Sequence, residues 1–231
     1  MTQFDFDLLV IGGGSGGVRA ARVSGSLGAK VAIVEMDRFG GTCVNVGCVP
    51  KKLYSYAAQV GYDLDELESL GWHIDGARFD WARLQANKNK NIEFLNGAYE
   101  RMLDRAKVTV LRGRGVVVDP HTVEVDGKRH TARYILLATG GTPSQPTIPG
   151  GAYLKNSNDI FAMETLPERL LVVGGGYIAL EFASIFKGLG RQVSLVHRRE
   201  QVLRGFDGEV SAALLEALAA RGIELHLSKT L

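Results

Sequence analysis

Two similar runs of apolar residues lie far apart in the chain. LLVIGGG at Leu8–Gly14 recurs as LLVVGGG at Leu170–Gly176, and the same offset matches Val31 with Val193. An apolar run that ends in a glycine cluster is typical of a buried strand followed by a tight turn. Each copy is therefore predicted to form a strand, a glycine turn, a helix and a second strand, which is a βαβ unit.

The segment between the copies carries other patterns. Amphipathic periodicity predicts helices from Pro50 to about Leu67 and from Trp81 to about Ala106. Short strands are expected in VTVLRGRGVVVD and TVEVDG, the second ending in an Asp-Gly turn. The run YILLATGG then predicts a buried strand before a Gly/Pro-rich crossing. The pattern indicates an α/β fold with two Rossmann-like domains, residues 1–155 and 156–231.

Composition and charge narrow the function classes. The 231 residues are 45% apolar, and 27 Lys and Arg face 25 Asp and Glu without a block of like charge. The charge pattern therefore does not indicate a surface that binds nucleic acid or a membrane. The amino terminus lacks the pattern of a secretory signal, and the longest apolar run contains Glu181. We expect a cytoplasmic protein without a membrane helix.

The first glycine turn fits a dinucleotide site. Its fingerprint, Gly12, Gly14 and Gly17, follows a strand and opens a helix, where a pyrophosphate can approach the helix amino terminus. Glu35 ends the second strand, where an acid accepts hydrogen bonds from ribose hydroxyls. The alternative is a structural glycine turn with a surface glutamate.

The second copy differs where the first has its acid. Its fingerprint is Gly174, Gly176 and Ala179, and His197 stands at the position that matches Glu35. The basic residues that follow are Arg198, Arg199 and Arg204. Guanidinium groups at this place suit a ribose 2'-phosphate, which predicts NADPH rather than NADH. A solvated basic surface is the alternative.

Both cysteines of the chain, Cys43 and Cys48, lie in GGTCVNVGCVPKK. Two cysteines cannot build a four-cysteine zinc site and no histidine is at ligand spacing, so no metal site is expected. A structural disulfide over so short a loop would gain little. A redox pair is favoured, with Pro50 starting a helix that places Cys48 near its positive end.

The cysteine segment resembles the redox-active disulfide of the flavin-dependent pyridine nucleotide-disulfide oxidoreductases. GGGSGG with Glu35, LLATGG at Leu136–Gly141, GGGYIALE and HRREQVLRGFD resemble further motifs of the same family, so the resemblance covers the whole chain. The Pro-Lys-Lys ending is most similar to members that reduce glutathione disulfide. Members that reduce mercuric ion or oxidise dihydrolipoamide typically have serine where Lys51 stands.

The resemblance implies FAD and NADPH as cofactors. The implied cofactor-binding residues are Gly12, Gly14, Ser15, Gly16, Gly17, Glu35, Gly41, Thr42, Cys43, Cys48, Lys51, Ala138, Thr139, Gly140, Gly174, Gly176, Tyr177, Ile178, Glu181, Arg198, Arg199 and Arg204.

The resemblance also assigns catalytic roles. Cys43 would attack the substrate, and Cys48 would face the flavin. Lys51 would lie at the reactive edge of the flavin, paired with Glu181, and Tyr177 would cover the flavin until the nicotinamide displaces it. The implied reaction is NADPH-dependent reduction of the Cys43–Cys48 disulfide through FAD, followed by attack of Cys43 on the substrate disulfide.

Four residues match the substrate pocket of the family members that act on glutathione disulfide. They are Ser15, Arg19, Arg22 and Tyr99. Two arginines favour an anionic peptide disulfide, because they attract its carboxylates and repel a cationic substrate. The alternative function is that of a related disulfide or mercuric ion reductase. The alternative interpretation of Arg19 and Arg22 is that they are surface residues without a role.

The resemblance further implies a homodimer with an interface domain. None of the five histidines lies in the His-Pro context of the family's acid, and the chain ends at Leu231, at roughly half a family chain. We therefore expect a fragment, with an incomplete FAD domain, a truncated NADPH domain and no dimerisation domain. A stand-alone flavin-binding module or thiol redox sensor is the alternative.

Overall fold

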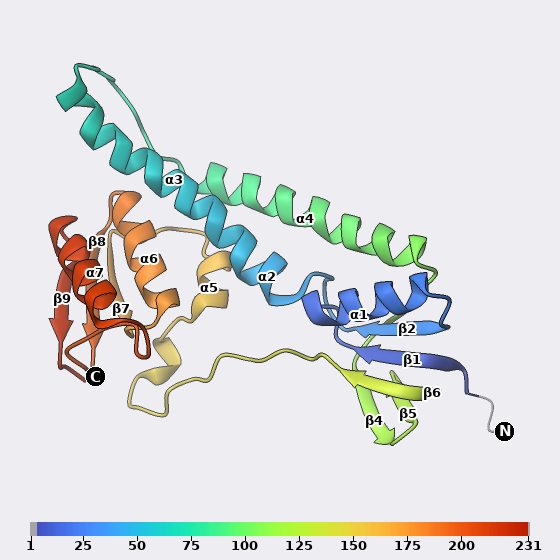
Figure 1. Cartoon of the computed structure of the whole chain (residues 1–231). Coiled ribbons are helices and arrows are strands. Elements are labelled where there is room, and N and C mark those ends of the chain that lie inside the picture. The colour runs from blue at the N-terminus through green and yellow to red at the C-terminus, as the bar shows by residue number, and fades with distance from the viewer. Residues whose placement is uncertain (1–3, 231) are drawn as a thin grey trace. The chain divides into compact units, whose positions relative to one another are not determined.

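The computed structural model describes residues 4–230 (Figure 1). Contacts within the chain divide it into two compact units. The first unit comprises residues 1–50 and 87–161, and the second comprises residues 51–86 and 162–231. The chain passes from one unit to the other within three helices, α3, α4 and α5. Neither unit is therefore a continuous stretch of sequence.

A mixed six-stranded sheet forms the centre of the first unit. Its order is β3-β2-β1-β6-β5-β4. The strands β1, β2, β3 and β6 are mutually parallel, and β4 and β5 add an antiparallel meander. The bounds of the strands are β1 (Phe6–Ile11), β2 (Val31–Glu35), β3 (Thr109–Arg112), β4 (Gly115–Asp119), β5 (Thr122–Val125) and β6 (Lys128–Leu137).

Helices cover one face of this sheet, and the meander covers the other. The helices of the unit are α1 (Ser15–Ser26), α2 (Gly41–Val46), the start of α3 (Cys48–Leu67), most of α4 (Trp81–Arg105) and most of α5 (Ser157–Ala162). Val10 and Ile33 point to the helical face and pack with Leu103 of α4. Leu9 and Ile11 point the other way, against Val123 of the meander. Alternating strand residues thus build two cores.

The second unit contains a three-stranded parallel sheet of order β7-β8-β9. Its elements are β7 (Arg169–Val173), α6 (Tyr177–Gly188), β8 (Gln192–His197), α7 (Gly208–Ala220) and β9 (Glu224–Leu227). Phe186 of α6 and Leu195 of β8 are fully buried. On β7, Leu171 and Val173 remain exposed. The βαβ unit predicted for the second copy is therefore present.

Three local features refine the sequence predictions. Asp126 and Gly127 both have positive φ, 47° and 81°, as a type I' Asp-Gly turn requires, which confirms that turn. The helix expected from Pro50 begins two residues earlier, at Cys48. Proline is tolerated in the first turn of a helix, where its missing N–H needs no partner. The short helix α2 was not predicted.

None of the helices within residues 4–230 combines the length and the apolar character needed to cross a lipid bilayer.

Candidate redox and nucleotide-binding site

The first glycine turn connects β1 to α1. Gly12 has φ of 110°, and a Cβ on this residue would lie 2.2 Å from the carbonyl oxygen of Ala138. Gly17 is equally restricted, because its Cβ would lie 1.9 Å from the Gly12 oxygen. Only glycine fits at these two positions. The turn therefore holds the start of α1 close to the end of β6, where Thr139 and Gly140 follow Ala138.

Glu35 binds the same turn. Its Oε2 accepts a hydrogen bond from the Gly13 amide at 2.6 Å, and its Oε1 accepts one from the Asp37 amide at 2.8 Å. Each carboxylate oxygen keeps a lone pair for a further donor. The acid is thus fixed beside the glycine turn and remains able to accept from a ribose hydroxyl.

The second unit repeats this geometry. Gly174 has φ of 129°, and its amide donates to Val196 at 2.9 Å, as the Gly12 amide donates to Val34 at 2.9 Å. His197 takes the place of the acid: a Cβ on Gly175 would lie 2.6 Å from its ring. The turn therefore carries an imidazole where the first unit carries a carboxylate.

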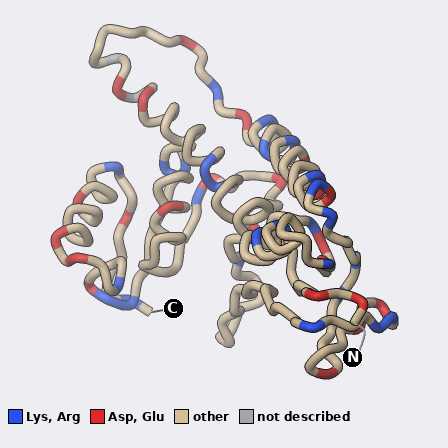
Figure 2. Tube along the Cα trace, turned by 45° about the vertical axis from the view of Figure 1, so that its right-hand side comes forward, with Lys and Arg blue, Asp and Glu red and all other residues tan. Residues whose placement is uncertain are grey.

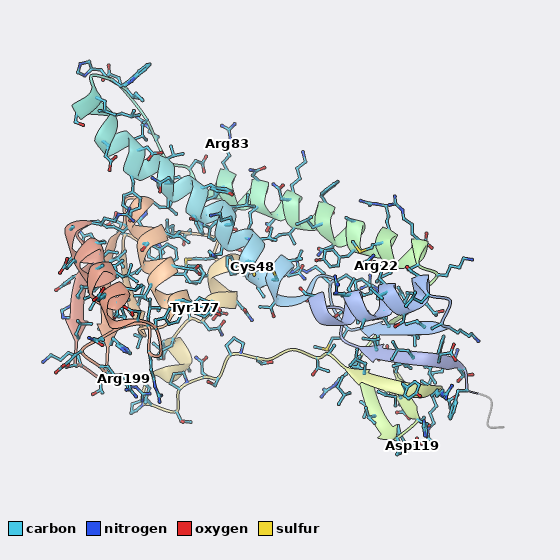
Figure 3. All side chains as sticks on the ribbon, viewed as in Figure 1. Arg22, Cys48, Arg83, Asp119, Tyr177 and Arg199 are labelled. Atoms are coloured by element: carbon cyan, nitrogen blue, oxygen red, sulfur yellow. The ribbon has the colours of Figure 1, made fainter. Side chains whose placement is uncertain are left out.

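The arginine loop that follows β8 is tied to the second glycine turn. The Leu203 amide donates to the Gly175 oxygen at 2.7 Å, and Ser211 Oγ donates to the Val202 oxygen at 2.9 Å. Leu203 has φ of 54°. Arg204 follows this anchor and is exposed. Arg198 and Arg199 are also exposed, and Arg199 is labelled in Figure 3. Basic residues gather beside the carboxyl end of the chain (Figure 2).

Both helices that follow the glycine turns begin without a side-chain cap among the described residues. Gly14 and Gly176 are the N-cap residues. A Cβ placed on Gly16 or Gly176 would meet no described atom within 4 Å. Free amides at the positive end of a helix, with open space above them, suit a phosphate group. The residues present therefore fit two dinucleotides.

The two cysteines lie on consecutive helices. Cys43 is half-buried on α2, and Cys48 is the exposed first residue of α3 (Figure 3). Both are free thiols in the structure. Burial raises the pKa of the Cys43 thiol, and a hydrogen bond with Cys48 raises it further. The two thiols therefore lie close enough to affect each other's ionisation.

The cysteine segment touches the first glycine turn. The Gly40 amide donates to the Gly13 oxygen at 2.8 Å. A Cβ on Gly41 would lie only 2.6 Å from the Cα of Gly14. Gly40 and Gly41 both have positive φ, 102° and 57°. Two successive glycines thus let α2, with Thr42 and Cys43 in its first turn, start directly against the turn that precedes α1.

Lys51 and Glu181 form an ion pair within the second unit. The Lys51 Nζ lies 2.7 Å from the Glu181 Oε1, and both side chains are partly exposed. Together with Tyr177 they line a pocket of about 350 Å³ between α3 and α6. Tyr177 is 62% exposed at the start of α6, followed by exposed Ile178. The pair expected from the sequence is therefore present.

The predicted substrate residues lie on two elements of the first unit. Ser15, Arg19 and Arg22 are on α1, with Arg19 exposed and Arg22 half-buried. Tyr99 is on α4 and packs against the helical core that α1 shares. Arg19 and Arg22 are three residues apart and so share a helix face.

The family described as pyridine nucleotide-disulphide oxidoreductase matches residues 6–231. The chain belongs to this family. Among its relatives are glutathione reductases from Burkholderia cepacia, 48% identical over 98% of this chain and 51% of the relative, and from Pisum sativum, chloroplastic or mitochondrial, 44% identical over 99% and 43%. A third, from Nostoc, is 41% identical over 96% and 48%. The chain thus spans about half the length of the curated relatives it matches.

This chain shares its fold with solved structures of the HOCl-induced flavoprotein disulfide reductase RclA from Escherichia coli. The Cu(II) complex superposes with a TM-score of 0.84 at 26% identity, covering 97% of this chain and 49% of that chain. A second RclA structure gives a TM-score of 0.85 at the same identity. The prediction of an α/β, Rossmann-like fold is therefore confirmed.

Sequence reasoning missed two polar residues at the site of this family member. Asn45 of α2 is buried, and Asn96 of α4 donates to its side-chain oxygen at 2.9 Å. Asn45 could have been noticed, because a polar residue in an apolar six-residue helix needs a partner. Nothing in the sequence pattern singles out Asn96 from the other asparagines of α4.

Proposed function

We propose that this chain forms the cofactor-binding and redox part of an NADPH-dependent flavoprotein that reduces glutathione disulfide. The observation that carries the proposal is the direct contact between the cysteine segment and the first glycine turn, at Gly40 and Gly13. This contact brings a reactive thiol pair to a site that fits a dinucleotide. The glutathione reductase relatives favour FAD and NADPH as the two dinucleotides.

Cys43, Cys48 and Lys51 have separate roles in the proposed reaction. The chemistry that the two cofactors supply when bound is transfer of two electrons from NADPH to the Cys43–Cys48 disulfide. The Cys43 thiolate attacks one sulfur of the substrate, forming a mixed disulfide and releasing the first glutathione, which takes up a proton. Cys48 then attacks Cys43, re-forms the internal disulfide and releases the second glutathione. Lys51, which pairs with Glu181, adds a positive charge to the first turn of the helix that begins at Cys48.

Charge supports the choice of both ligands. The exposed guanidinium groups of Arg198, Arg199 and Arg204 suit a 2'-phosphate and favour NADPH. Arg19 and Arg22 suit the carboxylates of glutathione disulfide. A related reductase for another anionic disulfide is the second candidate, because these arginines select charge rather than a particular peptide.

The proposal extends to assembly and location. The whole enzyme would be a homodimer, as the resemblance implies, with no role for nucleic acid or a membrane. A chain with a reactive redox pair as its two cysteines suits a reducing compartment such as the cytoplasm, where disulfides are more often catalytic than structural.

A trapping experiment tests the reaction without added cofactors. Reduced Cys48→Ser protein is mixed with glutathione disulfide, and the products are mapped by mass spectrometry. We expect a glutathione adduct on Cys43, because the thiol that would release it is gone. Reduced Cys43→Ser protein, whose one cysteine is Cys48, is the matched control, and both variants are compared at alkaline pH, where the raised pKa of Cys43 limits its thiolate least. Cys43→Ser should form its adduct more slowly, because we assign the attack on the substrate to Cys43.

The arginines give the second arm of this test. In the Cys48→Ser protein, the added substitution Arg22→Gln should slow trapping of glutathione disulfide. It should not slow trapping of the uncharged hydroxyethyl disulfide. Equal rates for the two cysteine variants would contradict the assigned roles. If Arg22→Gln left the trapping rate of Cys48→Ser unchanged with both disulfides, the result would contradict glutathione disulfide as the substrate. It would not contradict the thiol chemistry assigned to Cys43.

A further inference from the structure

We propose that Asn45 and Asn96 form a positioning pair that fixes Cys43 for thiol-disulfide exchange. The inference rests on the proposed function, because it concerns the thiol that attacks the substrate. Both asparagines bind backbone oxygens near Cys43 and each other, so we assign them the role of holding the segment that carries Cys43.

Asn45 closes the helical turn on which Cys43 lies. It is only 7% exposed and comes two residues after Cys43 on α2. Its Nδ2 is 3.0 Å from the Gly41 oxygen, four residues back, and 3.2 Å from the Phe39 oxygen. Gly41 and Asn45 thus bracket Cys43. A side-chain amide binds the backbone on both sides of the helix start.

Asn96 connects this turn to the long helix α4. Its Nδ2 donates to the Phe39 oxygen at 2.8 Å and to the Asn45 Oδ1 at 2.9 Å. An amide nitrogen has two protons, so both of its donors are used. The two amides share Phe39 as an acceptor and bind each other, which makes a closed network across three segments of the first unit.

The segment needs such an anchor because its own backbone cannot fix it. α2 has six residues, and a helix this short is unstable alone. It is preceded by Gly40 and Gly41, both with positive φ, and glycine loses more conformational freedom on ordering than other residues. Buried amides that are fully bonded rigidify their surroundings. Asn96 on the 25-residue α4 supplies the fixed point.

The equilibrium between the Cys43–Cys48 dithiol and disulfide reports this positioning directly. It depends on how well the two sulfurs are held together, and it is measured in dithiothreitol buffers of graded ratio, followed by acid quenching and alkylation. For Asn96→Ala we expect a disulfide about tenfold less favoured than in wild type, a rise in reduction potential of about 30 mV. Asn96→Asp keeps the size but places oxygen against two acceptors, so its shift should be at least as large.

Asn91→Ala is the matched control. Asn91 is exposed on the same helix, and its side-chain bonds to residues 4–230 stay within that helix, to Asn87, so this variant should keep the wild-type equilibrium. Circular dichroism follows folding of each variant. The proposal is overturned if folded Asn96→Ala and Asn96→Asp both stay within twofold of wild type. It is also overturned if both variants unfold, because the network would then support the whole unit rather than one thiol.

This experiment is independent of the proposed substrate. It uses neither glutathione nor a nucleotide, so a failed trapping experiment and an unchanged redox equilibrium lead to separate conclusions. The first would reject the reaction assigned to Cys43, and the second would reject only the positioning role of Asn45 and Asn96.

Discussion

The Cys43 thiol illustrates how its surroundings set the reactivity of a single side chain. Burial raises its pKa above the ordinary value of about 9, with a further rise from the hydrogen bond with Cys48. At neutral pH the reduced chain therefore holds mainly the thiol form of Cys43, which is the less reactive form. A base is needed to make the attacking thiolate efficiently at that pH.

Alkylation rates measure this directly. In the reduced chain, the rate of Cys43 modification by iodoacetamide should still rise with pH above pH 9, because the thiolate fraction increases up to the raised pKa. Cys48→Ala removes the smaller cause and should lower the midpoint only in part. Mass spectrometry of the Cys43 peptide gives the rate, with the unfolded chain as reference. A Cys43 midpoint at or below that of the unfolded chain would contradict the effect of burial.

At the scale of elements, α3 and α6 meet where both have glycine. A Cβ on Gly61 would lie 1.9 Å from the Gly188 oxygen, and a Cβ on Gly188 would lie 2.7 Å from the Ala58 oxygen. Beside this contact, Tyr62 donates to the Ser184 oxygen at 2.8 Å. The close approach of these backbones supports the two helices that carry Lys51 and Glu181.

Adding one methyl group tests the contact. Gly61→Ala should lower the free energy of unfolding by about 1–3 kcal/mol, because the obstructing atom belongs to a backbone that must shift. Gly97→Ala is the matched control in α4, where the nearest atom is the end of the flexible Arg101 side chain at 3.1 Å. It should raise stability by about 0.5–1 kcal/mol through helix propensity. Urea unfolding measures both. A Gly61→Ala protein as stable as Gly97→Ala would show that the helices do not touch there.

Sequence patterns predicted the elements that periodicity controls. The two βαβ copies and the helix from Trp81 followed from apolar spacing, since burial of one face selects it. The helix α2 was not predicted, because a segment of six residues is too short to show a helical period of apolar residues. The start of α3 was misplaced, because Pro50 is compatible with several first-turn positions. The Lys51–Glu181 pair came from family resemblance, and Asn96 needed the structure, because its partners are distant in sequence.

At the scale of the whole molecule, the two units carry the same glycine turn with different neighbours. Glu35 accepts from the Gly13 amide, and His197 packs against the equivalent Gly175. We expect His197→Glu to weaken NADPH binding at least tenfold relative to NADH, because a carboxylate there repels a 2'-phosphate and accepts from a ribose hydroxyl. Calorimetry gives both dissociation constants. His197→Gln has the same shape without the charge, and equal coenzyme ratios for Glu and Gln would refute the assignment.

Because the chain crosses between its units inside α3, α4 and α5, neither unit corresponds to one uninterrupted piece of a gene. A DNA segment encoding residues 162–231 alone would leave Glu181 without Lys51 and Gly188 without Gly61. Recombination that exchanged residues 162–231 alone would therefore break these contacts. The contacts on which each unit depends are therefore kept only when both of its segments are transferred together.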